Sequence, residues 1–188
     1  MEVTNVIDKN DVEKIKEKIS FNHPTYLPTY DECYVCGQNH SRGLRARFFI
    51  GDEGQVHAHF KPDHTQTGYE NIVHGGVISA LLDEILGWPI ALQTDRMCFT
   101  GELTVRFLKP LVAGGTYLAT AYPGTDQGKY WEGKGDVRDE HSQIYAKAQG
   151  KYFFLSDEQA AAVAAKLTYQ DDDLLIFRDR RQIEESEG

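Results

Sequence analysis

The sequence predicts an α+β fold in which one antiparallel sheet packs on one long helix. The apolar stretch from Asn71 to Trp88 has the period of a buried helix, and four strand-like runs follow it between Gly101 and Leu155. Turns containing Gly, Pro or Asp join those four runs, which is typical of an antiparallel meander. Two shorter strand-like runs precede the helix, so the expected order is strand, strand, long helix, four strands.

Length and composition restrict the class of protein. The chain has 188 residues, of which 40% are hydrophobic and 11% aromatic, and this fits one domain with appended segments. A net charge of −9 argues against a nucleic-acid partner. Three cysteines do not form a disulfide framework, and Met1 to Asn10 contains no apolar run of the signal-peptide kind. We therefore expect a cytoplasmic protein without a membrane span.

Residues 1–32 are expected to form an N-terminal extension with one short helix. Asn10 or Asp11 could cap this helix, which would carry Val12, Ile15 and Ile19 on one face. The turn-rich segment CYVCGQNHSRGL follows from Cys33 to Leu44 and opens the main domain, residues 33–155.

The main domain then continues with the two short runs, at residues 45–50 and 55–60. A hairpin turn is expected between them at residues 51–54, and a polar loop at 61–71 leads to the helix. The last segment, residues 156–188, is expected to form a C-terminal helix and a charged tail. Ser156 and Gln159 have the spacing of a capping box for that helix.

The central helix carries two adjacent acids among its apolar residues. On a helical wheel, Asp83 falls in a strip of small residues opposite the apolar half, whereas Glu84 points about 100° away. A buried carboxylate needs hydrogen-bond donors, water or a raised pKa. Asp83 is therefore a candidate general base, with a structural acid as the alternative, and Glu84 is expected to form a salt bridge or interface contact. Pro89 predicts a kink or a looser turn near Trp88.

The helix begins at His74-Gly75-Gly76, where backbone amides have no intrahelical acceptor. Glycines there let a carbonyl oxygen approach these amides, so the turn could bind an oxyanion. The helical rise puts Asp83 roughly 11 to 12 Å along the axis from Gly75, too far for both to act on one carbon. We therefore expect either a ligand that bridges them or a symmetric dimer with sites shared between two copies.

The motif VHGGVISALLDE, together with this strand pattern, resembles the hotdog-fold thioesterase superfamily over roughly residues 33–155. The upstream CYVCGQNHSRGL segment is similar to the one that precedes the domain in the branch of the thioesterase superfamily member 4 type; phenylacetate-type acyl-CoA thioesterases are also similar. The resemblance implies a sheet wrapped around the long helix, an acyl-CoA substrate, no cofactor, and a homodimer or dimer of dimers.

The resemblance also implies roles for particular residues. Asp83 would act as general base or nucleophile, and the amide of Gly75 or Gly76 from the other subunit would bind the thioester oxygen. Thr100 would place the water. Asn71 is a weaker candidate for substrate binding, because its spacing from His74 is not clearly that of the relatives.

Several candidate residues have more than one possible role. His74 could be a base but is favoured as an orienting residue, and Trp88 could line the acyl pocket. Arg106 and Lys109 could meet the phosphates of coenzyme A or be plain surface charges.

Cys33 and Cys36 have zinc-like spacing with His40 as a conceivable third ligand, but a packed turn is favoured and no metal is expected. A non-catalytic acyl-CoA-binding module is the alternative function, and a hotdog-type dehydratase is less favoured.

Overall fold

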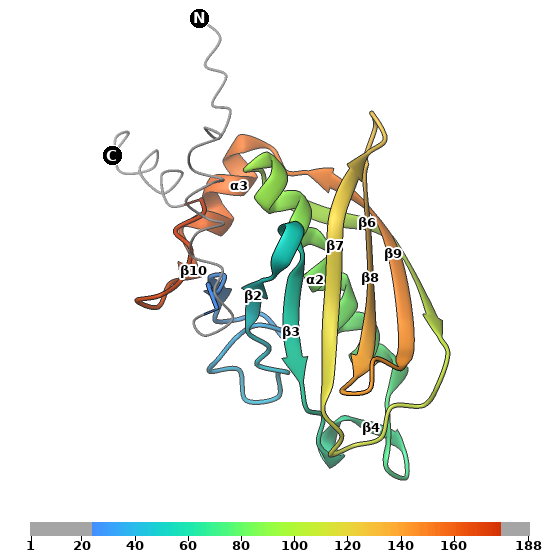
Figure 1. Ribbon diagram of the computed structural model, residues 1–188. Coiled ribbons are helices and arrows are strands. Elements are labelled where there is room, and N and C mark those ends of the chain that lie inside the picture. The colour runs from blue at the N-terminus through green and yellow to red at the C-terminus, as the bar shows by residue number, and fades with distance from the viewer. Residues whose placement is uncertain (1–23, 178–188) are drawn as a thin grey trace, which may run out of the picture.

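A six-stranded antiparallel sheet forms the main layer of the computed structural model, which describes residues 24–177 (Figure 1). The strand order is β2-β3-β7-β8-β9-β6. The strands are β2 (Phe48–Ile50), β3 (Val56–Phe60), β6 (Cys98–Phe107), β7 (Tyr117–Asp126), β8 (Trp131–Asp139) and β9 (Ile144–Phe154). The expected order of two strands, one helix and four strands is confirmed, whereas the helix expected after Asn10 lies outside the described residues.

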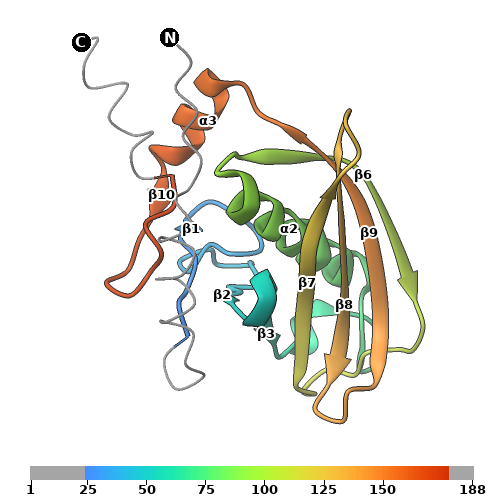
Figure 2. The same cartoon turned by 45° about the horizontal axis from the view of Figure 1, so that its top comes forward.

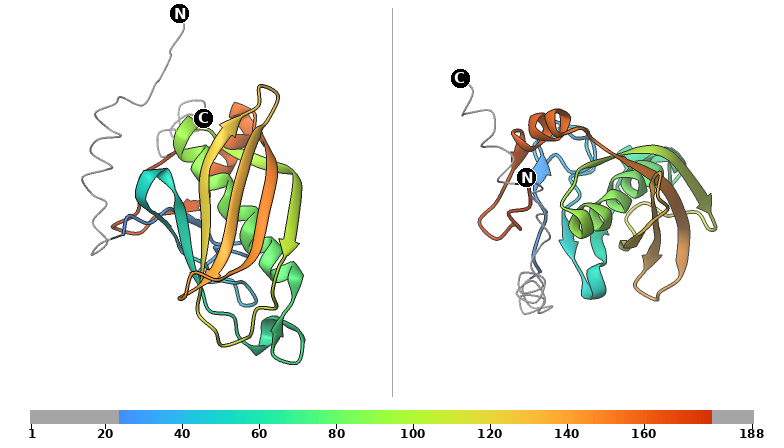
Figure 3. Two further views of the ribbon diagram at one scale, coloured as in Figure 1. Left: turned by 45° about the vertical axis from the view of Figure 1, so that its right-hand side comes forward. Right: turned by 90° about the horizontal axis from the view of Figure 1, so that it is seen from above.

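The sheet curves around one long helix, α2 (Gly75–Thr94), as the two views of Figure 3 show. The helix contacts β7, β8, β6, β9 and β3, so it lies along most of the sheet. Its fully buried side chains include Leu81, Leu82, Ile85 and Leu86, which belong to the apolar half of the predicted wheel. This α+β arrangement is the expected one, because an apolar helix face is stable only when it is packed against another layer.

The structure corrects two predictions about local structure, the length of the first strand and the loop at 61–71. The first strand is shorter than residues 45–50, because Arg45 has a φ of 52° and breaks the extended run. The loop expected at 61–71 contains a 3₁₀ helix, η2 (His64–Gln66), and a strand pair, β4 (Thr67–Tyr69) with β5 (Ile72–Val73). The turn between β2 and β3 is the 3₁₀ helix η1 (Asp52–Gly54).

The central helix continues through Pro89 to Thr94. Pro89 and Ile90 are buried, so packing against the core holds this last part of the helix although proline removes one backbone donor. By length and composition alone α2 could also cross a membrane. However, 56% of its apolar 18-residue stretch is buried inside the protein. That burial is the property of a core helix.

The segments on either side of the main domain meet each other. Strand β1 (Thr29–Tyr30) pairs with β10 (Leu167–Thr168), and α3 (Asp157–Ala164) connects the end of β9 to β10 along the chain (Figure 2). The capping box predicted for Ser156 and Gln159 is present. A second, smaller core joins α3 to the end of α2 and includes Ala91, Met97, Ala160, Ala164, Leu167 and Phe177.

Candidate active site

The start of α2 presents one free backbone donor beside a capped one. His74 is the N-cap, and its Nδ1 accepts a hydrogen bond of 2.9 Å from the Gly76 amide. The Gly75 amide occupies the first helical position, where a helix provides no acceptor. Of the two amides considered from the sequence, Gly75 is therefore the one available to an oxyanion, and the geometry of His74 is that of an orienting residue.

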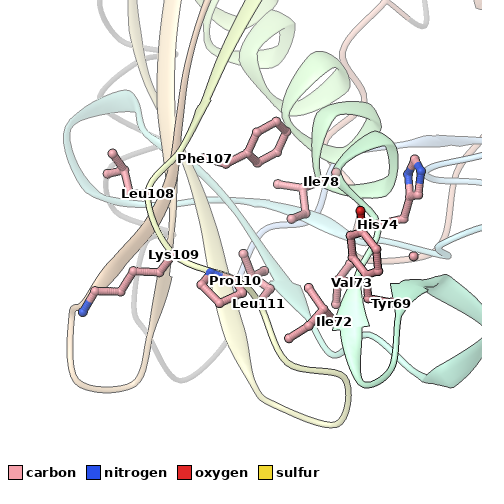
Figure 4. Close-up of a pocket in the computed structure, with 12 residues that line it drawn as sticks. Tyr69, Ile72, Val73, His74, Ile78, Phe107, Leu108, Lys109, Pro110 and Leu111 are labelled. Atoms are coloured by element: carbon pink, nitrogen blue, oxygen red, sulfur yellow. The ribbon is translucent and has the colours of Figure 1, made fainter.

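His74 and Gly75 border a cavity of about 400 Å³ (Figure 4). Phe107, the last residue of β6, lies against the glycine turn: a Cβ added at Gly75 would come within 3.1 Å of the Phe107 ring. Most other lining residues are apolar, among them Ile72, Val73, Ile78, Leu108 and Leu111. The cavity therefore offers a backbone donor in apolar surroundings and no carboxylate.

A second cavity of about 410 Å³ lies beside the middle of the helix and contains the acid. Asp83, Thr100, Trp88 and Tyr152 line it, so the structure brings together three of the residues selected from the sequence. Thr100 on β6 and Tyr152 on β9 are directly opposite each other in the sheet. This pairing places the Thr100 hydroxyl in the cavity of Asp83, as a water-placing role would require.

Tyr152 was missed by the sequence analysis. Its hydroxyl donates a 3.0 Å hydrogen bond to the main-chain carbonyl of Asp83, which fixes the helix against β9 at that residue. Burial and the nearby Asp83 carboxylate raise the pKa of Tyr152, so its hydroxyl stays a neutral donor. One tyrosine in an aromatic-rich strand carries no signal for this role, because the register of β9 against α2 is a tertiary property.

Glu84 faces a different group from the one expected. Its Oε2 lies 2.8 Å from the Cys33 sulfur, and Cys36 completes the cluster. Burial, followed by the Cys33 charge, raises the pKa of Glu84 well above its usual range. Among the described residues, Glu84 therefore contacts thiols and not a cation, contrary to the salt-bridge expectation, whereas the alternative of an interface contact stays a prediction.

The candidate substrate-binding residues are dispersed. Asn71 has a φ of 59°, and its carbonyl accepts a hydrogen bond from the Ala113 amide, so its backbone shapes the turn between β4 and β5. Within residues 24–177, neither cavity includes Asn71 or Arg106 in its lining. Lys109 lies at the rim of the first cavity, extends away from His74 and donates to Gln143 Oε1 at 2.7 Å (Figure 4).

The two cavities share no lining residue. Within one protomer, Asp83 and the Gly75 turn thus open to separate cavities, which is compatible with the expectation that the two groups are too far apart to act on one carbon.

The fold belongs to the hotdog class, and comparisons with known proteins agree. Residues 70–145 match the model of the family described as Thioesterase superfamily. The resemblance to hotdog-fold thioesterases inferred from the sequence is therefore confirmed. A search of curated proteins finds no match.

Several solved structures share the fold. A thioesterase superfamily protein aligns with a TM-score of 0.61 at 19% identity, over 78% of this chain and 76% of its own. The PaaI protein of the E. coli phenylacetic acid degradation operon aligns with a TM-score of 0.55 at 21% identity, over 62% and 83%. A Streptococcus mutans protein bound to acetyl CoA aligns with a TM-score of 0.52 at 23% identity, over 58% and 87%.

Proposed function

We propose that this protein is an acyl-CoA thioesterase whose active sites are each assembled from two copies of the chain. One observation carries the proposal. Strand β6 connects the two half-sites, which are the cavity that contains Asp83 and the cavity at the Gly75 turn. Thr100, near its start, lines the cavity of Asp83, and Phe107, at its end, lies against Gly75.

Strand β6 is also an edge of the sheet. Within the described residues it pairs with β9 on one side, and Phe99 and Phe107 on it are each half exposed. A long edge strand with exposed apolar side chains is a template for pairing with another chain, and most oligomers are symmetric dimers.

If two copies pair antiparallel through β6 about a twofold axis near its midpoint, Thr100 comes opposite Phe107 of the partner subunit. Each Asp83 would then face the glycine turn of the other copy, and the two half-sites would form two complete sites.

The chemistry follows from the two halves. The Asp83 carboxylate takes a proton from a water molecule placed by Thr100, and the water oxygen bonds to the thioester carbonyl carbon. The Gly75 amide donates to the oxyanion of the tetrahedral intermediate. The carbon–sulfur bond then breaks, and the leaving thiolate takes the proton held by Asp83. In a variant of this route the carboxylate attacks first, and water hydrolyses the resulting anhydride.

The proposal of an acyl-CoA substrate is supported by exposed positive charges near the first cavity and by the ligand of a structural neighbour. Lys109 and Arg106 are exposed at the end of β6 near the first cavity, where they could meet the phosphates of coenzyme A. One structural neighbour is bound to acetyl CoA. The free thiols of Cys33, Cys36 and Cys98 fit a reducing compartment, and we place the protein in the cytoplasm.

The first test measures thiol release from acyl-CoA substrates ranging from acetyl to palmitoyl, together with aromatic acyl groups. Turnover of at least one of them above background is expected. Tight binding without release of thiol would instead identify a non-catalytic acyl-CoA-binding module.

Mixing two inactive variants tests the shared site. Asp83→Asn removes the base in one copy, and Gly75→Val blocks the oxyanion turn in the other. In a mixed dimer, one site keeps both wild-type halves. Random pairing of equal amounts should therefore restore about a quarter of wild-type activity. Sites contained within single chains would leave the mixture as inactive as its parents, while the panel of thioesters would still show activity in the wild type.

A further inference from the structure

Three metal-ligating side chains converge beside the second cavity. The Cys33 and Cys36 sulfurs and a Glu84 carboxylate oxygen all lie within 4.8 Å of one another. The two cysteines come from the turn that precedes the sheet, and Glu84 comes from the middle of α2, so the cluster joins segments far apart in the sequence. All three residues line the cavity that contains Asp83.

Backbone amides around the two cysteines donate hydrogen bonds to both sulfur atoms. The amides of Val35 and Cys36 donate to the Cys33 sulfur at 3.2 and 3.3 Å, and the Tyr30 amide donates to the Cys36 sulfur at 3.4 Å. Backbone donors of this kind orient thiolate ligands and stabilise their charge.

Gly37 closes the same turn. Its amide donates to the Cys33 carbonyl at 3.0 Å, and a Cβ at this position would lie 2.3 Å from the Asp31 carbonyl oxygen. The turn therefore depends on glycine to bring its backbone amides around the sulfurs. A turn that only filled space on the sheet would not need three donors aimed at two thiols.

We propose that Cys33, Cys36 and Glu84 bind a divalent cation of the zinc class. Two thiolates and one carboxylate are ligands that zinc accepts, and three protein ligands leave one tetrahedral position open. All three proposed ligands line the second cavity, from which a small fourth ligand could reach the metal. The site thus ties the segment from Cys33 to Leu44 to the helix that carries Asp83.

The ligand distances require a small movement. Zinc–sulfur and zinc–oxygen bonds at a tetrahedral angle separate the two ligand atoms by about 3.6 Å. Cys33 Sγ and Glu84 Oε2 are 2.8 Å apart, as a hydrogen bond between them requires. A shift of under about 1 Å, within reach of a Glu side-chain rotation, converts the hydrogen-bonded pair into two ligands. The metal then replaces the shared proton, as is usual when ligands must be deprotonated.

His40, the third ligand considered from the sequence, does not join the cluster. Its Nδ1 accepts from the Arg42 amide at 3.3 Å, and its ring packs edge-on against Tyr34. The expectation of no metal depended on the lack of a second cysteine pair. Glu84 supplies a further ligand from a place in the sequence that the Cys-x-x-Cys spacing does not indicate.

The test measures the metal itself. The full-length chain, purified without chelators and supplied with zinc, should contain one zinc per chain by plasma mass spectrometry. Cys33→Ser and Glu84→Gln should each weaken zinc binding by at least the roughly 10- to 100-fold that loss of an outer-shell partner costs. Cys98→Ser is the matched control, because Cys98 lines the same cavity outside the cluster, and it should keep its zinc.

Cobalt and alkylation give readouts that do not depend on the variants being folded. Wild-type protein loaded with Co²⁺ should show sulfur-to-cobalt charge-transfer absorption. Zinc should protect the partly exposed Cys33 from alkylation, and a chelator should remove that protection. Zinc well below one per chain, no cobalt–sulfur absorption, or equal zinc loss in Cys98→Ser and Cys33→Ser would each overturn the proposal, whatever the thioesterase assays show.

Discussion

The two cavities along α2 differ in what they offer a substrate. The one at the start of the helix has a free Gly75 amide, a capped Gly76 amide and apolar walls that include Phe107. The one beside the middle has a carboxylate, Asp83, with the Thr100 hydroxyl nearby. In the proposed mechanism, the first cavity would stabilise negative charge and the second would activate water. One protomer would then carry two complementary halves of the proposed site.

The largest expected effect falls on the cavity with the acid. Asp83→Asn keeps the shape of the side chain but removes the base, so kcat for thioester hydrolysis should fall at least about 100-fold. Thiol release measures the rate, and light scattering checks that the oligomeric state persists. Asp172→Asn, an exposed acid outside both cavities, is the control. A near wild-type rate in Asp83→Asn would show that Asp83 is not the base, so the second cavity would no longer differ from the first by supplying one.

A smaller effect is expected at the start of the helix. His74→Ala removes the acceptor for the Gly76 amide, and loss of an N-cap side chain lowers the free energy of unfolding by about 0.5 to 2 kcal/mol. If His74 orients the turn and does not abstract a proton, as its hydrogen bond to the Gly76 amide indicates, kcat should change less than about tenfold. Thermal unfolding and thiol release measure the two quantities, with His64→Ala as the control. A 100-fold loss of kcat would instead make His74 a second base and give the first cavity a catalytic group of its own.

The smallest effect concerns the rim of the first cavity. Lys109→Ala should raise KM for acyl-CoA by less than about fivefold, because exposed charge pairs contribute about 1 kcal/mol or less. Hydrolysis of the matching N-acetylcysteamine thioester, which has no phosphates, should not change. Lys166→Ala, on an exposed residue outside both cavities, is the control. Equal effects on both substrates would show that Lys109 acts on the cavity and not on coenzyme A.

Much of the fold could be predicted because its signals are local. The apolar half of α2, the alternation in β6 and the capping box at Ser156 each lie within a few residues of sequence. The boundaries at Arg45 and Pro89 were less predictable, since backbone conformation at Arg45 and burial at Pro89 depend on distant neighbours. Burial of the last turns of α2 offsets the missing proline donor, and a local rule contains no information on that burial.

The residues of the candidate site also divide into those that local sequence could predict and those that it could not. Asp83 and the glycine turn could be found because a carboxylate in a buried helix and two glycines at its start are unusual in themselves. Tyr152 and the partnership of Glu84 with Cys33 could not be found, because strands and turns from distant parts of the chain bring these groups together. Gly76 was a candidate donor until the structure placed the His74 ring on its amide.

By itself, the sequence determined the order of the elements, the amphipathic helix and the separation between Asp83 and the glycine turn. These follow from periodicity and from the fixed rise of a helix. Tertiary structure decided which amide is free, which side chains surround each acid, and that the two halves open to different cavities. Contacts between residues far apart in the chain set these properties, and such contacts depend on how the layers pack rather than on any local pattern.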